Sequence, residues 1–209
     1  MRILIVDDHA VVRAGVRQIL ADAFPDAAFG EAADGRQAVA SAMDKVWDLA
    51  VVDVAMPGRS GVDVLKDMKA LRPKLPVLVF SMYPEEQYAV RALRAGAAGY
   101  LTKASLSDEL VAAVRKALAG GRYVSAELAE RLASELGTPA KGPPHEALSD
   151  RELEVLRRLG AGKAVKQIAA ELSLSANTVS TYRKRILEKL KLHANADLIR
   201  YAVEHKMLE

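Results

Sequence analysis

Three carboxylates directly follow hydrophobic segments in the first quarter of the chain. Asp7 and Asp8 come after the apolar residues 3–6, and Asp53 interrupts the apolar run of residues 49–56. A buried carboxylate is costly unless it has a partner, so a carboxylate at the end of the most hydrophobic segment indicates chemistry. A single Asp at such a place is usually a turn former or a helix N-cap. The presence of three such carboxylates in one part of the chain favours a functional site.

Two further polar residues close hydrophobic segments downstream. Ser81 follows the apolar residues 77–80, and Lys103 lies just after residues 100–101. In a parallel sheet the carboxyl ends of the strands meet at one rim, where ligands bind. Three carboxylates at that rim would repel one another unless a cation joined them. A few hard oxygen ligands with room for water favour Mg²⁺.

This arrangement predicts that Asp53 is a nucleophile that forms an aspartyl phosphate. Lys103 can neutralise the charge that develops on the phosphoryl group, and Ser81 can donate a hydrogen bond to a phosphoryl oxygen. A Mg²⁺-dependent phosphohydrolase that uses Asp53 is the enzymatic alternative, and it would turn over small phosphoesters many times.

Five alternations of strand and helix position these residues. Short apolar runs predict the strands, and apolar residues at helical spacing predict a helix after each one. The strands are expected at residues 2–7, 28–32, 49–53, 77–80 and 100–101. Such alternation with short connections indicates a doubly wound α/β domain, in which a five-stranded parallel sheet of order 2-1-3-4-5 has helices on both faces.

Glycines and prolines divide the rest of the chain. Gly120 and Gly121 close the α/β unit, and residues 124–136 have the spacing of one amphipathic helix. The three prolines and two glycines of residues 137–144 are predicted to exclude regular structure. We therefore predict a first domain at residues 1–120, a linker with a short helix at 121–145, and a second domain at 146–209.

The second domain carries the whole net charge of the chain. Residues 146–209 contain 12 Lys and Arg against 9 Asp and Glu, and the complete chain has a net charge of +3. Ser149 and Glu152 predict a capping box, and the apolar spacing that follows predicts four helices. The second and third are expected to be joined by a two-residue turn, Ser173-Leu174, before a basic helix, which is typical of a helix-turn-helix.

The third predicted helix of this domain has one polar face. The side chains expected to point outward, towards base edges in the major groove, are Asn177, Ser180, Thr181, Lys184 and Glu188, and Thr178 is a further expected DNA contact. Those expected to reach phosphates are Arg185, Lys189, Lys191 and Lys166. The alternative is a solvated helix in a bundle that binds protein.

The composition excludes some classes of protein. The chain has no cysteine, so disulfides and thiolate metal sites are excluded. No apolar stretch approaches the ~20 residues that a membrane span needs, and no early segment resembles a signal peptide. With 51% hydrophobic and 27% charged residues, we expect a globular cytoplasmic protein without a membrane partner.

The first 120 residues resemble the receiver domain of two-component response regulators. The matching residues are "VDD" at 6–8, "DVAMPG" at 53–58, Ser81 and "GYLTK" at 99–103. The resemblance implies a flavodoxin-like fold in which Asp53 accepts phosphate from a histidine kinase. It implies Mg²⁺ ligation by Asp8, Asp53 and the Ala55 carbonyl, with Asp7 acting through water. Tyr100 matches the aromatic residue that turns inward when the Ser81 hydroxyl moves. Ala104 departs from the family, in which a cis proline often follows the lysine.

Residues 148–209 resemble the LuxR-type helix-turn-helix of the NarL/FixJ subfamily. The shared motif includes Glu152 with "EVL", Gly162, "IA" at 168–169 and "KL" at 189–190. The resemblance implies that the positions of Ser180, Thr181 and Lys184 read bases. It also implies that the last helix, residues 195–206, pairs two DNA-bound domains. The expected dimer contacts are Leu198, Tyr201 and Ala202.

The two resemblances together predict a response regulator that controls transcription. Mg²⁺-dependent phosphorylation of Asp53 by a histidine kinase would control homodimerisation and binding to promoter half-sites. The protein would be no enzyme beyond forming and hydrolysing its own acyl phosphate. A DNA-binding regulator that works without phosphorylation is the closest alternative.

Overall fold

A computed structural model describes the chain except for residues 57–59, 106, 131–142, 206 and 209. The chain forms two compact units, Met1–Gly137 and Thr138–Glu209. None of the described helices is long and apolar enough to cross a membrane.

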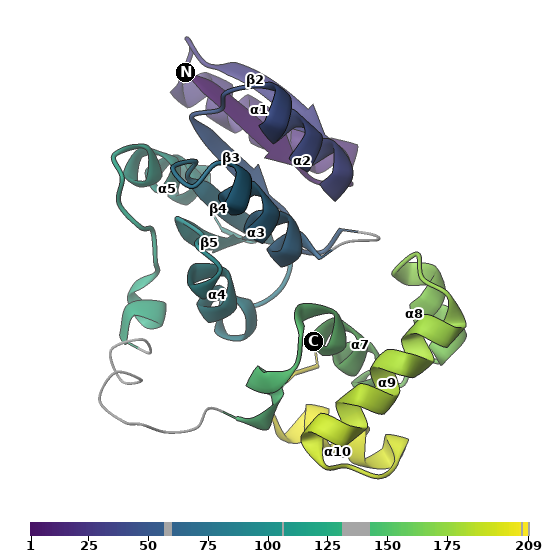
Figure 1. The fold of residues 1–209 in the computed structure, drawn as a ribbon. Coiled ribbons are helices and arrows are strands. Elements are labelled where there is room, and N and C mark those ends of the chain that lie inside the picture. The colour runs from purple at the N-terminus through teal and green to yellow at the C-terminus, as the bar shows by residue number, and fades with distance from the viewer. Residues whose placement is uncertain (57–59, 106, 131–142, 206, 209) are drawn as a thin grey trace. The chain divides into compact units, whose positions relative to one another are not determined.

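The first unit contains a five-stranded parallel sheet (Figure 1). Its strands are β1 (Arg2–Val6), β2 (Ala28–Ala32), β3 (Leu49–Val52), β4 (Val77–Ser81) and β5 (Gly99–Thr102). They pair in the order β2-β1-β3-β4-β5, which confirms the predicted topology. The central strands β1, β3 and β4 are almost completely buried, as expected for strands covered on both faces.

Five helices cover this sheet. They are α1 (Ala10–Ala23), α2 (Gly35–Asp44), α3 (Gly61–Leu71), α4 (Glu85–Arg94) and α5 (Ser107–Leu118). Helices α1 and α5 pack together on one face, where Leu20, Val114 and Ala117 join Ile3 and Ile5 in one core. Helices α2 and α3 pack against each other, and α4 packs beside α3 and against β5. The predicted α/β architecture is therefore confirmed.

The segment after α5 packs on the first unit. The Tyr123 N–H donates to the Ala98 carbonyl at 2.7 Å, and Tyr123 forms a parallel bridge with Gly99. A Cβ on Gly99 would lie 2.7 Å from the Tyr123 carbonyl oxygen, so this approach requires glycine. The Ser125 hydroxyl donates to Glu85 Oε2 at 2.6 Å and accepts from the Leu128 N–H.

Part of the predicted linker is therefore structured. Residues 126–130 are helical and Leu128 is buried, as the amphipathic pattern predicts. The rest of that predicted helix lies outside the described residues. The expectation of no regular structure in residues 137–144 is wrong at Pro144, which begins the 3₁₀ helix η1 (Pro144–Ala147). Proline is tolerated in a first helical turn, where its missing N–H has no partner to lose.

The second unit contains the four predicted helices. They are α7 (Asp150–Gly160), α8 (Val165–Glu171), α9 (Ala176–Leu190) and α10 (Asn195–Glu204). Residues 172–175 join α8 to α9, a longer connection than the predicted Ser173-Leu174 turn. Ser173 adopts a left-handed φ of 53°, and the Ser175 hydroxyl caps α9 by accepting from the Thr178 N–H at 3.0 Å.

The predicted capping box of α7 is confirmed and has an additional partner. The Ser149 N–H donates to Glu152 Oε2 at 2.7 Å, and the Glu152 N–H donates to Ser149 Oγ at 3.3 Å. The Lys189 ammonium of α9 donates to the same Oε2 at 2.6 Å. Burial opposes the charged form of Glu152, but the hydrogen bonds from Lys189 and Ser149 outweigh it and hold the pKa of Glu152 below its ordinary value.

We expect Glu152→Gln to destabilise the second unit by about 1 kcal/mol at pH 7, because it removes one charged partner of Lys189. A lowered pKa means that the stabilisation is complete above the ordinary value of 4.5 and is lost as the pH falls through the lowered pKa. The difference between wild type and variant should therefore shrink at acid pH. Amide hydrogen exchange in α7 and α9 measures it. Glu188→Gln, which changes a mostly exposed carboxylate 3.9 Å from Lys184, should leave exchange unchanged; an equal effect of both variants would contradict the assignment.

Candidate phosphoacceptor site and DNA-binding helix

Asp7, Asp53 and Lys103 meet at the carboxyl end of the sheet. The Lys103 ammonium lies 2.6 Å from Asp7 Oδ2 and 2.7 Å from Asp53 Oδ2. Both aspartates are almost fully buried, with 3% and 2% of their surface exposed. Their strands are neighbours in the sheet, and the Asp53 N–H donates to the Val6 carbonyl at 2.8 Å. The predicted convergence of these residues is thus present in the structure.

The charges of this cluster are unequal. Burial raises the pKa of Asp53, although Lys103 and the Ala55 N–H lower it and Asp7 adds repulsion. Burial alone would lower the pKa of Lys103, but Asp53 and Asp7 outweigh it and raise that pKa. Lys103 is therefore a permanent cation at neutral pH. One ammonium thus lies between two buried carboxyl groups.

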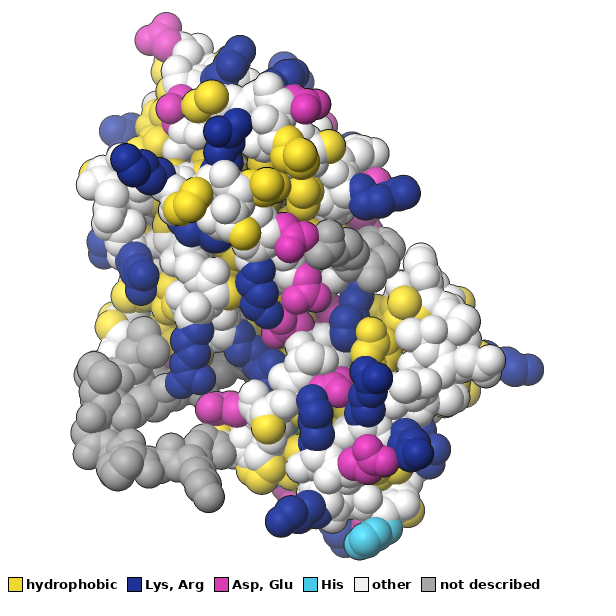
Figure 2. Space-filling view, in the orientation of Figure 1, with side chains coloured by type: hydrophobic (Ala, Val, Ile, Leu, Met, Phe, Trp, Pro, Cys, Tyr) yellow, Lys and Arg dark blue, Asp and Glu magenta, His cyan; other side chains and the backbone are white. Residues whose placement is uncertain are grey.

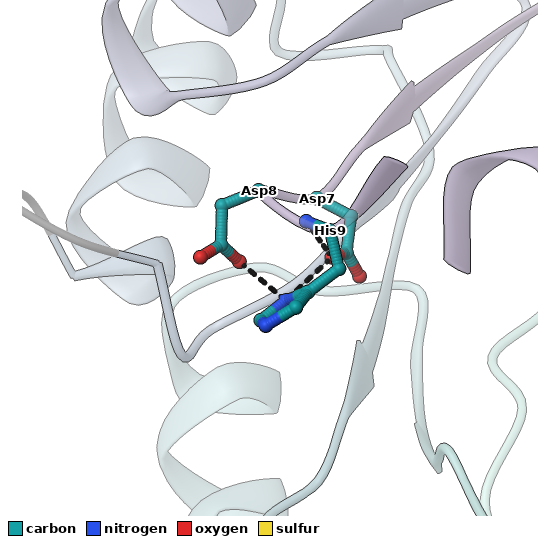
Figure 3. Close-up of side chains that lie close together, drawn as sticks. All are labelled: Asp7, Asp8 and His9. Atoms are coloured by element: carbon teal, nitrogen blue, oxygen red, sulfur yellow. Dashed lines mark hydrogen bonds and ion pairs between the residues drawn. The ribbon is translucent and has the colours of Figure 1, made fainter. Parts of the chain in front are cut away.

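Asp8 adds a third carboxylate, and its neighbour His9 lies beside it (Figure 3). Asp7, Asp8 and His9 each offer one possible metal-ligand atom, and these three atoms lie within 4.8 Å of one another. Asp8 Oδ1 is buried and accepts no hydrogen bond from any described residue, although His9 Nδ1 is 2.9 Å away. A buried acceptor that receives no hydrogen bond, beside the Asp7 carboxylate, fits a hard divalent cation such as Mg²⁺. The His9 side chain is 66% exposed.

Ser81 and Tyr100 are joined through the backbone of one residue, Tyr83. Ser81 Oγ accepts from the Tyr83 N–H at 3.2 Å, and the Tyr100 hydroxyl donates to the Tyr83 carbonyl at 2.8 Å. Both side chains are buried, so Tyr100 already points inward in this structure. The Lys103-Ala104 bond is trans, as are the other peptide bonds of the described residues.

Three residues support the site without having been predicted. Arg13 donates to the Asp7 carbonyl at 2.7 Å and to Glu31 at 3.0 Å, which holds the end of β1 against α1. Gly61 lies against the Asp53 backbone, where a Cβ would be 2.1 Å from the Asp53 carbonyl oxygen. Tyr83 joins Ser81 to Tyr100 as described. Only Gly61 carried a signal in the sequence, because it starts a helix close after the Asp53 strand. The predicted ligand Ala55 donates its N–H to Asp53 Oδ1 at 2.9 Å.

Helix α9 presents the polar face that the sequence predicts. Val179, Ile186 and Leu190 are buried. The exposed predicted DNA contacts are Asn177, Ser180, Thr181, Lys184, Arg185, Lys189 and, on α8, Lys166. Lys and Arg side chains are spread over the face of this unit on which α9 lies (Figure 2). A shallow hollow on α9 is lined by Asn177, Thr178, Thr181, Tyr182 and Arg185.

Lys189 differs from the other basic residues of this helix. Its ammonium is bound to Glu152 at 2.6 Å and lies 3.4 Å from the Ala147 carbonyl. This pairing joins it to α7 within the domain, and its expected role as a phosphate contact stays a prediction.

The expected dimer residues lie inside the second unit. Leu198 and Ala202 are fully buried and Tyr201 is 9% exposed, because α10 packs on α7. The Tyr201 hydroxyl also accepts from the His145 N–H of η1 at 3.2 Å. These side chains therefore support the fold and offer no surface to a second copy, which corrects the expectation. The large apolar side chains that α10 does expose are Ile199 and Val203, at 40% and 57%.

Two family models match the chain. Residues 3–115 match the response regulator receiver domain, and residues 146–202 match the bacterial regulatory proteins of the luxR family. The chain is 35% identical over 209 residues to the response regulator GacA of Pseudomonas protegens, covering 100% of this chain and 98% of that protein. It is 33% identical over 206 residues to the response regulator UvrY of Escherichia coli K12, covering 98% and 94%.

A solved structure of the two-component response regulator RcsB in complex with DNA is similar over almost the whole chain. Its TM-score is 0.59 and its sequence identity 25%, and the alignment covers 97% of this chain and 98% of that one.

We expect Lys103→Met to lower the free energy of unfolding of the first unit by about 3 kcal/mol at pH 7 without divalent cations, since it leaves Asp7 and Asp53 buried without their cation. Denaturant titration followed by fluorescence of Trp47 measures this loss. Arg17→Met also removes one positive charge, from a mostly exposed side chain 3.7 Å from Glu31, and should change the stability by less than about 1 kcal/mol. Equal losses in both variants would show that the cluster is not held by Lys103.

Proposed function

The chain belongs to the response regulators that join a receiver domain to a LuxR-type DNA-binding domain, and we propose that phosphorylation of Asp53 by a histidine kinase controls its binding to promoter DNA. The observation that carries the proposal is the cluster in which Lys103 lies between the buried carboxylates of Asp7 and Asp53. A nucleophile, a cation for phosphoryl charge and acidic ligands are together in a chain that also has a DNA-binding domain.

In the proposed transfer, a carboxylate oxygen of Asp53 attacks the phosphorus atom of a phosphohistidine. A P–O bond to Asp53 forms, the P–N bond breaks, and the imidazole leaves with that electron pair. Lys103 offsets the phosphoryl charge, and Ser81 turns its hydroxyl from Tyr83 to a phosphoryl oxygen. Asp8, Asp53 and the Ala55 carbonyl would hold Mg²⁺, with Asp7 acting through water, and the ion would supply further positive charge.

The connection between β4 and α4 supports a route from this site to the linker. Ser81 and Tyr100 both bind the backbone of Tyr83, so a movement of Ser81 acts on that residue. Two residues later Glu85 begins α4 and accepts the hydrogen bond of Ser125. A shift at Tyr83 would therefore bias the position of the segment that leads to the second domain. We propose a population shift in which phosphorylation favours the DNA-binding form.

We propose that α9 enters the major groove of DNA. Asn177, Ser180, Thr181 and Lys184 would meet base edges, and Arg185 and Lys166 would meet phosphates. Lys189 is not among the proposed DNA contacts because its ammonium binds Glu152. Thr178, at the start of the helix, remains a proposed contact. A regulator that binds chromosomal DNA would act in the cytoplasm.

Phosphorylation is expected to strengthen DNA binding by about tenfold, the size of a modest allosteric coupling. The measurement is the affinity of the intact protein with Mg²⁺, with and without acetyl phosphate, for a duplex selected from random DNA at fixed salt. Asp53→Asn should abolish the difference. Asp63→Asn on α3, a half-exposed carboxylate 3.5 Å from Lys66, should keep it. Equal specific affinity in both states would favour a phosphorylation-independent regulator, and absence of specific binding in every state would favour a protein-binding module.

A homodimer on two half-sites is proposed to form through Ile199 and Val203. Val203→Asp should then weaken binding to a duplex with two half-sites and leave the affinity for a single half-site unchanged, since a charge in an apolar contact is costly. Leu198→Ala provides the contrast. It removes a buried side chain, destabilises the domain by about 2–5 kcal/mol, and should weaken binding to both duplexes. Loss on both duplexes with Val203→Asp would exclude this dimer surface.

A further inference from the structure

The hydroxyl group of Thr181, at the centre of the exposed face of α9, is already used within the helix. It donates to the carbonyl of Asn177, one turn earlier, at 2.9 Å. This bond joins a threonine to the carbonyl four residues before it, a common arrangement for threonine in a helix. The hydroxyl proton is therefore used, which leaves the methyl group and the acceptor side of the hydroxyl oxygen for a ligand.

Thr178, one turn before Thr181, has the same property. Its hydroxyl lies 2.8 Å from Ser175 Oγ, the atom that caps the helix by accepting the Thr178 N–H. The hydroxyl groups of both threonines therefore form hydrogen bonds within the domain. Both also line the shallow hollow on α9, together with Tyr182. Asn177 and Arg185 complete the lining of the hollow, and its two threonines and aromatic ring can contact a small apolar group.

A DNA major groove offers one such group. Thymine is the only base that presents a methyl group there, and the methyl of threonine is a suitable contact for it. A hydrogen bond donated by Thr181 to a base would first require the bond to Asn177 to break, whereas the Thr181 oxygen could still accept from a base amino group. Because one hydrogen bond would replace another, the gain would be small. An apolar contact requires no such exchange.

We infer that Thr181 is a specificity-determining residue that recognises thymine through its methyl group, with the 5-methyl of the base seated in the hollow beside Tyr182. This inference rests on the proposed DNA-binding function. It assigns the same residue a contact of a different kind from the hydrogen bond that its polar character suggests.

The test uses the intact protein, treated with acetyl phosphate and Mg²⁺, and a duplex selected from random DNA. Each thymine of one half-site is replaced in turn by deoxyuridine, which removes only the methyl group. At one position the wild type should lose about fourfold in affinity, the value of one buried methyl group. Thr181→Val keeps a methyl group without the hydroxyl and should bind and discriminate like wild type. Thr181→Ser keeps the hydroxyl without the methyl, and should bind the thymine duplex about fourfold more weakly and no longer distinguish uracil.

The opposite pattern would overturn the inference: Thr181→Ser behaves like wild type, and Thr181→Val loses affinity, which would assign recognition to the hydroxyl. A wild type that binds its selected site specifically but responds to no uracil replacement would also overturn it and leave the proposed function intact. If the wild type bound no DNA site specifically, both the inference and the proposed function would be contradicted. Circular dichroism of the two variants checks that the helix is unchanged.

Discussion

The ammonium group of Lys103 between two buried carboxylates is the interaction on which the first unit depends. Asp7 and Asp53 end neighbouring strands, and the order of the parallel sheet brings them together. Without a cation, two carboxylates so deeply buried would favour the unfolded chain. The same burial of two carboxyl groups that makes the cluster costly also brings together the nucleophile and the acidic group that our proposed chemistry uses. Stability and function thus have one electrostatic origin here.

Beside that cluster, the backbone of one loop residue connects two buried side chains. Tyr83 binds Ser81 with its N–H and Tyr100 with its carbonyl, so the two groups proposed to respond to phosphorylation share one residue of a loop. The loop ends at Glu85, whose carboxylate holds Ser125 beyond the sheet edge. Hydrogen bonds at Tyr83 and Glu85, joined by the backbone between these residues, therefore lead from the centre of the receiver to the first part of the predicted linker. Such a connection needs two arrangements of the loop to carry a signal.

The second unit uses its polar groups in a different way. Glu152 joins a helix start to the Lys189 ammonium, and Thr181 bonds to its own helix. Polar side chains on a DNA-binding helix are thus divided between those that complete the fold and those that remain for a ligand. The division explains why Lys189, although basic and on α9, is a poor candidate for a phosphate contact, and why a threonine can offer an apolar surface.

The sequence by itself determined the features that depend on local spacing. Alternating apolar runs located the five strands, the positions of Asp7 and Asp53 after two of them located the acidic cluster, and Ser149 with Glu152 located the start of α7. These predictions succeed because strand ends, capping boxes and helix periodicity depend on residues a few positions apart. The predicted sheet order also brought Asp7, Asp53 and Lys103 together, but only the tertiary structure decided which other distant groups meet. Lys189 binds Glu152, which lies 37 residues away in the sequence, and the Tyr201 hydroxyl binds His145, which lies 56 residues away. The apolar residues Leu198 and Ala202 mark the buried face of α10, but the pattern is the same whether α7 or a second copy covers it, and the fold shows that α7 does.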